Sequence, residues 1–178
     1  MKKENGFTLV ELLVAMVIGA IVMAAAYSSF VSQQKAYGIT ESVSDIQQNL
    51  RAAMLYIERD LRMAGFNPKK ETTFGFTAIP DDSFTFTKDV NENGVVDTGE
   101  TITYDIASNT LRRDDGTAGG LQEIADNITG MQLEYFNVNG TVTSQPESVR
   151  SVSVKLIAQE DNHTRELITL IKCRNMGL

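Results

Sequence analysis

The chain has 178 residues and a formal net charge of −7, from 16 lysines and arginines against 23 aspartates and glutamates. That length suits one membrane segment plus one globular domain, and the acidic balance argues against nucleic-acid binding, which needs a basic surface. Its single cysteine, Cys173, cannot form an internal disulfide. We expect a buried free thiol there, with a bond to another chain as the alternative.

The first predicted element is an apolar segment near the N-terminus. From Phe7 to Ala26 the only ionisable side chain is Glu11, and the run is about 20 residues long, which is the length a helix needs to cross a bilayer. Lys2 and Lys3 precede it, so the positive-inside rule predicts a cytoplasmic N-terminus and a head on the far side of the membrane. A carboxylate at the centre of such a helix is unfavourable by about 2.5–3.5 kcal/mol, so Glu11 needs a partner.

Three simpler interpretations of this segment compete. A secretory signal peptide could end at Ala26, but its apolar core spans only about 7–15 residues. A plain signal anchor explains the length of the run and leaves Glu11 unexplained. A buried helix of a soluble protein is disfavoured, because an apolar run of about 20 residues is longer than a small core covers.

Residues 6–11 read GFTLVE and follow a short leader that contains two lysines. This stretch resembles the processing site of type IV prepilins and of type II secretion pseudopilins. The resemblance implies that residues 1–6 are a cytoplasmic leader and that prepilin peptidase cuts between Gly6 and Phe7 and N-methylates Phe7. It also implies that the helix over residues 7–31 then packs with others in a filament. Glu11 would be the assembly carboxylate, because the new Phe7 amine of a neighbouring subunit can pair with it.

Beyond the apolar run, residues 32–65 are predicted to continue the same helix into the head, with an amphipathic pattern whose apolar stripe the sheet covers. Apolar side chains recur at steps of three and four, and no proline interrupts residues 7–64. The apolar stripe consists of Val43, Ile46, Leu50, Ala53, Met54, Ile57, Leu61 and Ala64. Gly65 is the expected left-handed cap, and Pro68 cannot continue the helix. Residues 56–66, YIERDLRMAGF, resemble the helix end of PilW-type minor pilins.

After Pro68 the apolar period becomes two, which predicts a β-rich head over residues 66–178. The predicted strands are Thr73–Ala78, Ser83–Thr87, Thr101–Ile106, Thr110–Arg113, Ile128–Phe136, Val149–Ala158 and Arg165–Cys173. Residues 160–163 and 108–109 are predicted to be hairpin turns, and residues 121–125 one helical turn. A long helix followed by antiparallel strands is an α+β fold, here of the type IV pilin kind.

Residues 89–100 match the twelve-residue calcium loop, a site built from oxygen ligands. The ligands expected from that pattern are Asp89, Asn91, Asn93, the carbonyl of Val95, Asp97 and Glu100. Gly94 supplies the sharp turn, and Val96 is expected to point into the protein. We expect weak, structural Ca²⁺ binding in the range of about 10⁻⁴–10⁻³ M. The alternative is a solvated hairpin turn, because Asp, Asn and Gly also dominate turns.

We recognise no nucleophile motif, phosphate loop or cysteine pair, so we predict no catalysis and no small-molecule substrate. His163 is expected in a solvated turn, and Arg112 and Arg113 are expected to face solvent. The resemblance implies a minor pilin of the bacterial inner membrane, later on the pilus at the cell surface. Its partners would be prepilin peptidase, other minor pilins and the major pilin. The alternatives are a J-type type II secretion pseudopilin and a membrane-anchored periplasmic calcium-binding module.

Overall fold

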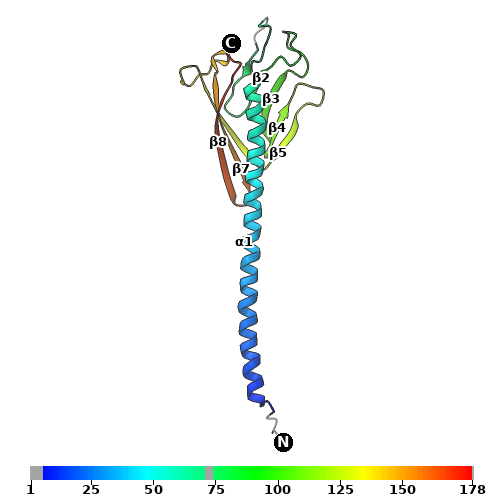
Figure 1. Cartoon of the computed structure of the whole chain (residues 1–178), viewed down its shortest axis with the longest axis vertical. Helices are drawn as coiled ribbons and strands as arrows, with labels where there is room; N and C mark the ends of the chain where they lie inside the picture. Colours follow the sequence, from blue (N-terminus) through cyan, green and yellow to red (C-terminus); the bar gives the residue numbers. More distant parts are fainter. Residues whose placement is uncertain (1–5, 71–73, 178) are drawn as a thin grey trace. The chain divides into compact units, whose positions relative to one another are not determined.

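The structure is a computed structural model that describes residues 6–70 and 74–177 (Figure 1). The elements in chain order are α1 (Leu9–Met63), β1 (Phe76–Ala78), β2 (Phe84–Thr87), β3 (Thr101–Ala107), β4 (Thr110–Asp114), β5 (Gln122–Asp126), β6 (Ile128–Phe136), the 3₁₀ turn η1 (Pro146–Ser148), β7 (Ser151–Glu160) and β8 (His163–Lys172). The predicted α+β class, a long N-terminal helix followed by antiparallel strands, is confirmed.

The chain divides into two compact units between Glu41 and Ser42. The first unit contains the apolar part of α1. The second, which we call the head, is described from Ser42 to Gly177 and contains the rest of α1 and every strand. The compact unit therefore includes more than twenty helical residues that precede the predicted head boundary at residue 66. Residues 1–5 of the predicted leader lie outside the described residues.

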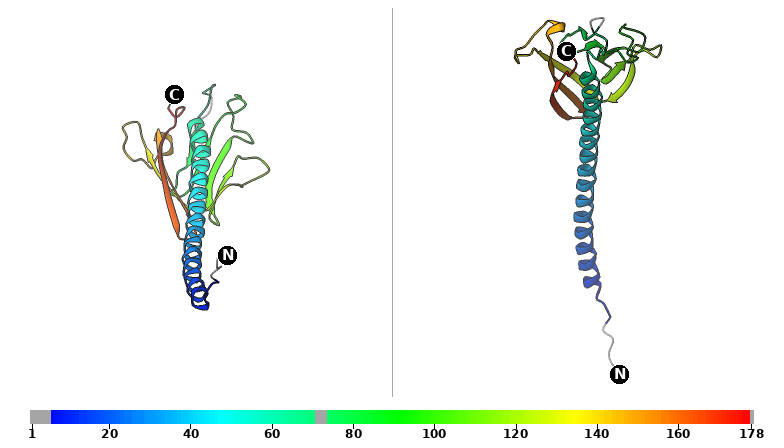
Figure 2. Two further views of the ribbon diagram at one scale, coloured as in Figure 1. Left: turned by 60° about the horizontal axis from the view of Figure 1, so that its bottom comes forward. Right: turned by 45° about the horizontal axis from the view of Figure 1, so that its top comes forward.

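The strands of the head form two antiparallel sheets. One has the order β1-β2-β3-β4-β5 and the other the order β6-β7-β8. Figures 1 and 2 show the C-terminal half of α1 running along both sheets, with β1–β5 on one side and β6–β8 on the other. The core lies where the helix meets the two sheets, because buried side chains of all three form one apolar cluster.

The apolar stripe of α1 is buried as predicted, because it covers the sheets. Its buried members are Ile46, Leu50, Ala53, Met54, Ile57, Leu61 and Ala64. The helix begins two residues later than expected, at Leu9, and ends at Met63. Gly65 has a φ of +76°, as predicted for a left-handed cap, and an added Cβ there would lie 2.7 Å from the sulfur of Met176. This position therefore requires glycine.

The strand predictions hold with small shifts at their ends and one error. Residues 121–125 were expected to form a helical turn, but they contribute to β5, whose Ala125 pairs with Leu111 of β4. Pairing with β4 and the burial of Ala125 override the helix propensity of this short segment. The start of the first predicted strand, Thr73, lies outside the described residues. The turn at Ser108 and Asn109 is confirmed, with φ values of 53° and 60°.

Candidate functional site

The predicted processing site lies in exposed backbone outside any helix or strand, just before α1. Phe7 is 88% exposed, and an added Cβ at Gly6 would have no heavy atom within 4 Å. The fold therefore places no steric demand for glycine at residue 6. A glycine that its own chain does not require is consistent with recognition by another molecule.

Glu11 is engaged by the residue that precedes the helix. Its Oε2 accepts hydrogen bonds from the backbone N–H of Thr8 at 2.8 Å and from the Thr8 hydroxyl at 2.9 Å. The Glu11 N–H donates back to the Thr8 hydroxyl at 3.3 Å. This reciprocal pair is a capping box, and it explains why α1 starts at Leu9. The T-x-x-E pattern at residues 8–11 was available in the sequence as a signal for it.

The apolar part of α1 is long and apolar enough to cross a membrane by length and composition. Its best window of 18 residues has a mean hydropathy of 2.6, and none of that window is buried within the protein. Large side chains such as Leu9, Met16 and Ile21 are more than 60% exposed. A continuous apolar surface of this size must be covered by lipid or by another protein.

The acidic loop at residues 89–100 is folded around its own carboxylates. Buried Asp89 accepts hydrogen bonds from the N–H groups of Asn93 at 3.1 Å and Gly94 at 2.9 Å. The side-chain oxygen of Asn93 accepts from the N–H of Val95 at 2.8 Å. Gly94 has a φ of +84°, which allows the sharp turn. The predicted turn is therefore present.

The carboxylate of Glu100 closes the loop. It is buried and accepts hydrogen bonds from the N–H groups of Val90 at 2.8 Å, Asn91 at 3.2 Å and Asp97 at 2.9 Å. Asp97 is more exposed and accepts from the side-chain amides of Asn91 at 3.0 Å and Asn93 at 2.5 Å. These two hydrogen bonds lower the pKa of Asp97, with the bond from Asn91 the larger cause.

The donor types of the loop fit a calcium ion, but its oxygens face N–H groups here. Among the described residues, no three histidine, cysteine, aspartate or glutamate side chains come together as a metal site. The amide groups of Asn91 and Asn93 present nitrogen to Asp97, so an ion would need these amides to rotate. The expectation that Val96 points inward is wrong, because its side chain is 41% exposed.

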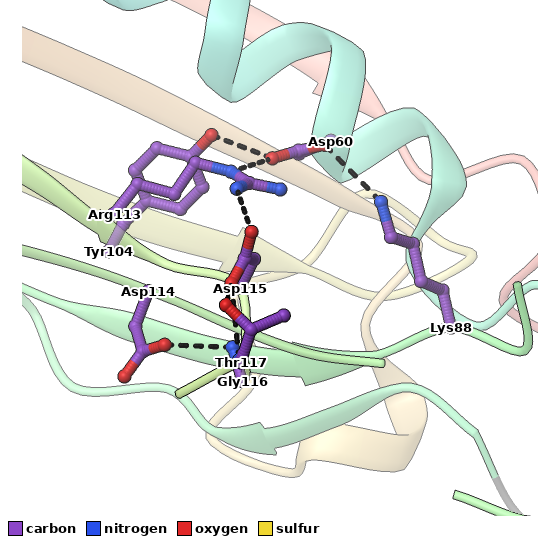
Figure 3. Close-up of polar contacts among 8 residues, drawn as sticks. All are labelled: Asp60, Lys88, Tyr104, Arg113, Asp114, Asp115, Gly116 and Thr117. Atoms are coloured by element: carbon purple, nitrogen blue, oxygen red, sulfur yellow. Dashed lines mark hydrogen bonds and ion pairs between the residues drawn. The ribbon is translucent and has the colours of Figure 1, made fainter. Parts of the chain in front are cut away.

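The head contains a buried charge cluster that no sequence pattern predicted. Asp60 of α1 accepts hydrogen bonds from the hydroxyl of Tyr104 at 2.8 Å and from Nε of Arg113 at 2.7 Å, and Nζ of Lys88 lies 3.5 Å away (Figure 3). Burial, and then the charge of Asp60, raises the pKa of Tyr104. The prediction that Arg113 faces solvent is wrong, because Arg113 pairs with buried Asp60. Arg112 is half-buried and pairs with Asp105 at 2.6 Å.

Comparison with known proteins gives two matching families and one relative. Residues 1–27 match the prokaryotic N-terminal methylation motif, and residues 40–172 match the family described as prepilin peptidase-dependent protein B. The pilin-like protein PilA3 of Thermus thermophilus is 25% identical over 168 aligned residues, which cover 81% of this chain and 72% of that relative.

Proposed function

Because the chain belongs to the family of prepilin peptidase-dependent protein B, which confirms the expected membership of the type IV prepilins, we propose that it acts as a minor pilin. The chain is a type IV pilin-type subunit, anchored in a membrane and processed by prepilin peptidase. Its proposed task is to help start or cap a type IV pilus. It would do so by packing its N-terminal helix against other minor pilins and the major pilin, with its head on the periplasmic side until it reaches the cell surface.

The observation that carries this proposal is the exposed apolar half of α1 behind the GFTLVE motif. None of its most apolar window is buried within the protein. A single chain therefore exposes a large apolar surface, and contact of that surface with water is unfavourable. Lipid would cover it before assembly, and the equivalent segments of other subunits would cover it in a pilus. A subunit that moves between these two environments requires a segment of this kind.

Cleavage between Gly6 and Phe7 is the first prediction. We expect the chain recovered from membranes to lack its first six residues and to carry a methyl group on the Phe7 amine, as measured by intact-mass spectrometry. Gly6→Leu should block cleavage without affecting the fold, because the Cβ position of Gly6 is open. Gly38→Ala, at a second open position, is the matched control and should be cut normally.

The outcome of that measurement also tests the alternative classes. A chain that keeps Met1, or one cut after Ala26, would exclude the pilin role and leave a membrane-anchored calcium-binding module. A J-type type II secretion pseudopilin shares the processing site, so it needs a different test. The minor pilin role predicts the protein in surface fibres released by shearing. The pseudopilin role predicts instead that deletion stops protein secretion while the surface fibres persist.

We further propose that the loop at residues 89–100 binds Ca²⁺ weakly through Asp89, Asn91, Asn93, the Val95 carbonyl, Asp97 and Glu100. The order of oxygen donors and the Asx turns inside the loop support this site. Its role would be structural, because a bound cation would offset the repulsion between the three carboxylates proposed as ligands. The unbound loop holds its shape through N–H groups, so binding would stabilise the head rather than fold it.

Asp97→Ala is the sharpest variant for the calcium prediction. The carboxylate of Asp97 accepts hydrogen bonds only from side-chain amides. The carboxylates of Asp89 and Glu100 accept from backbone N–H groups, so their removal would unfold the loop. Glu92→Ala removes the same charge from a non-ligand position of the same loop and is the matched control. Calorimetric titration of the full chain in detergent should give a Kd of about 10⁻⁴–10⁻³ M. Asp97→Ala should weaken it roughly tenfold or more. Equal weakening in both variants would contradict the site.

A further inference from the structure

The head carries a shallow groove on the exposed side of α1. It has a volume of about 980 Å³ and lies between the last turns of α1, the segment at Lys88 and Val90, and the C-terminal segment. Leu55, Met63 and Val90 line it and are 67%, 38% and 61% exposed. In Figure 1 the head part of α1 lies in front of both sheets, so the sheets do not cover this apolar surface.

The groove on α1 has an excess of positive charge, so we call the residues that line it the cationic surface. Two of its cations pair with the two carboxylates that line the same groove. The other two, Arg59 and Arg174, are exposed and form no ion pair with any residue that the structure describes. The four cations are Arg59, Arg62, Lys88 and Arg174, and the two carboxylates are those of Glu58 and Asp60.

A second shallow groove, with the opposite charge, lies beside β6. It has a volume of about 660 Å³, and Ile79, Asp81, Glu134 and Val142 are among the residues that line it. Asp81 and Glu134 are exposed and form no ion pair within the described ranges, and Val142 is 69% exposed. None of the described residues that line this groove is a lysine or an arginine. We call the residues that line it the acidic surface.

The two surfaces lie on opposite sides of the head. Successive side chains of a strand point to opposite faces of its sheet. Leu133 and Tyr135 of β6 are buried in the core that the sheets share with α1. Glu134, which lies between them, therefore points away from α1, whereas the cationic surface includes the outer side of α1.

The two surfaces also lie at a similar height along α1. One row of backbone hydrogen bonds crosses the sheet from Phe136, which is bridged to Val142 of the acidic surface, through β7 to Cys173. Two residues later, the side chain of Asn175 donates to the carbonyl of Arg62 in the cationic surface at 3.1 Å. A second copy can therefore meet the first by a sideways displacement.

We infer that the cationic surface of one copy of this chain binds the acidic surface of a second copy, so that the heads associate front to back. This inference goes beyond the proposed function and concerns the head alone. The unpaired Arg59 and Arg174 of one copy would meet the unpaired Asp81 and Glu134 of the next. Complementary charges of this kind select the partner and fix its orientation. The apolar side chains of the two surfaces would cover each other.

This contact preserves the direction of α1 in both copies. Each copy contributes a different surface, so the contact is heterologous and needs no two-fold axis that would turn one copy over. Copies anchored by the same helix in one membrane can therefore form it, and anchoring raises the local concentration of their heads. A two-fold contact through either surface alone would instead bring like charges together, which is unfavourable.

Two cysteine variants of the full chain, co-expressed with different tags, test the contact in membrane vesicles. With a short bismaleimide cross-linker, Leu55→Cys and Val142→Cys should give at least roughly tenfold more mixed dimer than Leu55→Cys and Leu121→Cys. Leu121 is also exposed and lines neither groove, so it is the matched control. The native Cys173 is buried, so the wild-type chain should give no cross-linked dimer.

Two outcomes of the cross-linking would overturn the inference. Equal yields from the two pairs of variants would show that the surfaces do not meet. A homodimer of Leu55→Cys alone, as abundant as the mixed dimer, would show that the cationic surfaces of two copies meet each other instead.

Charge reversal tests the complementarity in the same pair of cysteine variants. Arg59→Glu with Arg174→Glu, on the Leu55→Cys chain, should reduce the mixed dimer roughly fivefold or more, because like charges then face each other. Asp81→Lys with Glu134→Lys, on the Val142→Cys chain, should do the same. When both reversed chains are co-expressed, opposite charges meet again and the original yield should return. A yield that stays low would exclude the contact, and misfolding of either chain cannot produce the recovery.

Discussion

The position of Glu11 is explained by two partners: Thr8 of its own chain, and the proposed Phe7 amine of a neighbouring subunit. In the described chain its carboxylate completes the capping box with Thr8, which contributes about 1 kcal/mol to a helix start. A neutral glutamine makes the same box, so capping alone does not require a charge. The pairing proposed with the Phe7 amine of another subunit does require one. The two roles can therefore be separated by substitution.

We predict that Glu11→Gln keeps the helix start and fails in assembly. Glu11→Ala should fail equally, and Thr8→Val, which removes the hydroxyl but not the charge, should assemble like the wild type. All three should be cleaved normally after Gly6. The measurement is the amount of protein in sheared surface fibres, with a reduction of tenfold or more expected for both Glu11 variants, since a tenfold change corresponds to about 1.4 kcal/mol. Wild-type assembly of Glu11→Gln would assign this carboxylate to capping alone.

At the scale of helices and strands, the sequence predicted the contacts between segments that are adjacent in the chain. The β7–β8 hairpin and the turn at Ser108 and Asn109 join neighbouring residues, and their patterns predicted them. The cluster around Asp60 was not predicted, because its partners Tyr104 and Arg113 are 44 and 53 residues away. A charged residue on a helix is usually solvated, and only the approach of β3 and β4 to α1 buries this one.

The Asp60 cluster should contribute strongly to the stability of the head. Asp60 is 5% exposed, so Asp60→Asn would leave Arg113 and Lys88 partly buried without their counter-charge. We expect a loss of about 3–5 kcal/mol in the free energy of unfolding, measured with denaturant. Asp45→Asn removes the same charge from an exposed site on α1 and should change it by less than about 0.5 kcal/mol. Similar values for both variants would show that the cluster is not a stabilising contact.

The same cluster predicts a pH dependence at the alkaline end. The pKa of Tyr104 is raised by burial and by Asp60, so the folded head keeps this phenolic proton at a pH where the unfolded chain releases it. Its contribution to stability is therefore complete below about pH 10 and decreases as the pH rises above that value. Burial also raises the pKa of the Cys173 thiol to about 12, so the stability of the folded head decreases further as the pH rises above about 9.

At the scale of the whole molecule, the sequence predicted the class of fold and an amphipathic helix over residues 32–65 that continues into the head. The structure begins the compact head at Ser42. The apolar core includes side chains of α1 from Ile46 onward, so the globular unit needs the second half of the helix. A change of composition marks where the apolar segment ends. It does not mark where packing against the sheets begins, because that depends on which helical face the distant strands cover.

This boundary gives the last prediction, on two fragments. A fragment of residues 42–178 retains the whole core cluster, so it should stay in solution without detergent and unfold cooperatively, with a Tm within about 2–4 °C of that of the full chain in detergent. A fragment of residues 66–178 loses six buried apolar side chains of α1, from Ile46 to Leu61. Each large apolar group stabilises by about 1.5–3 kcal/mol, and the total stability of a domain is only about 5–15 kcal/mol, so the shorter fragment should not fold. Thermal unfolding followed by circular dichroism compares the two. A cooperative transition in the shorter fragment would mean that the sheets hold together without the helix, and the core assigned here to α1 would not be required.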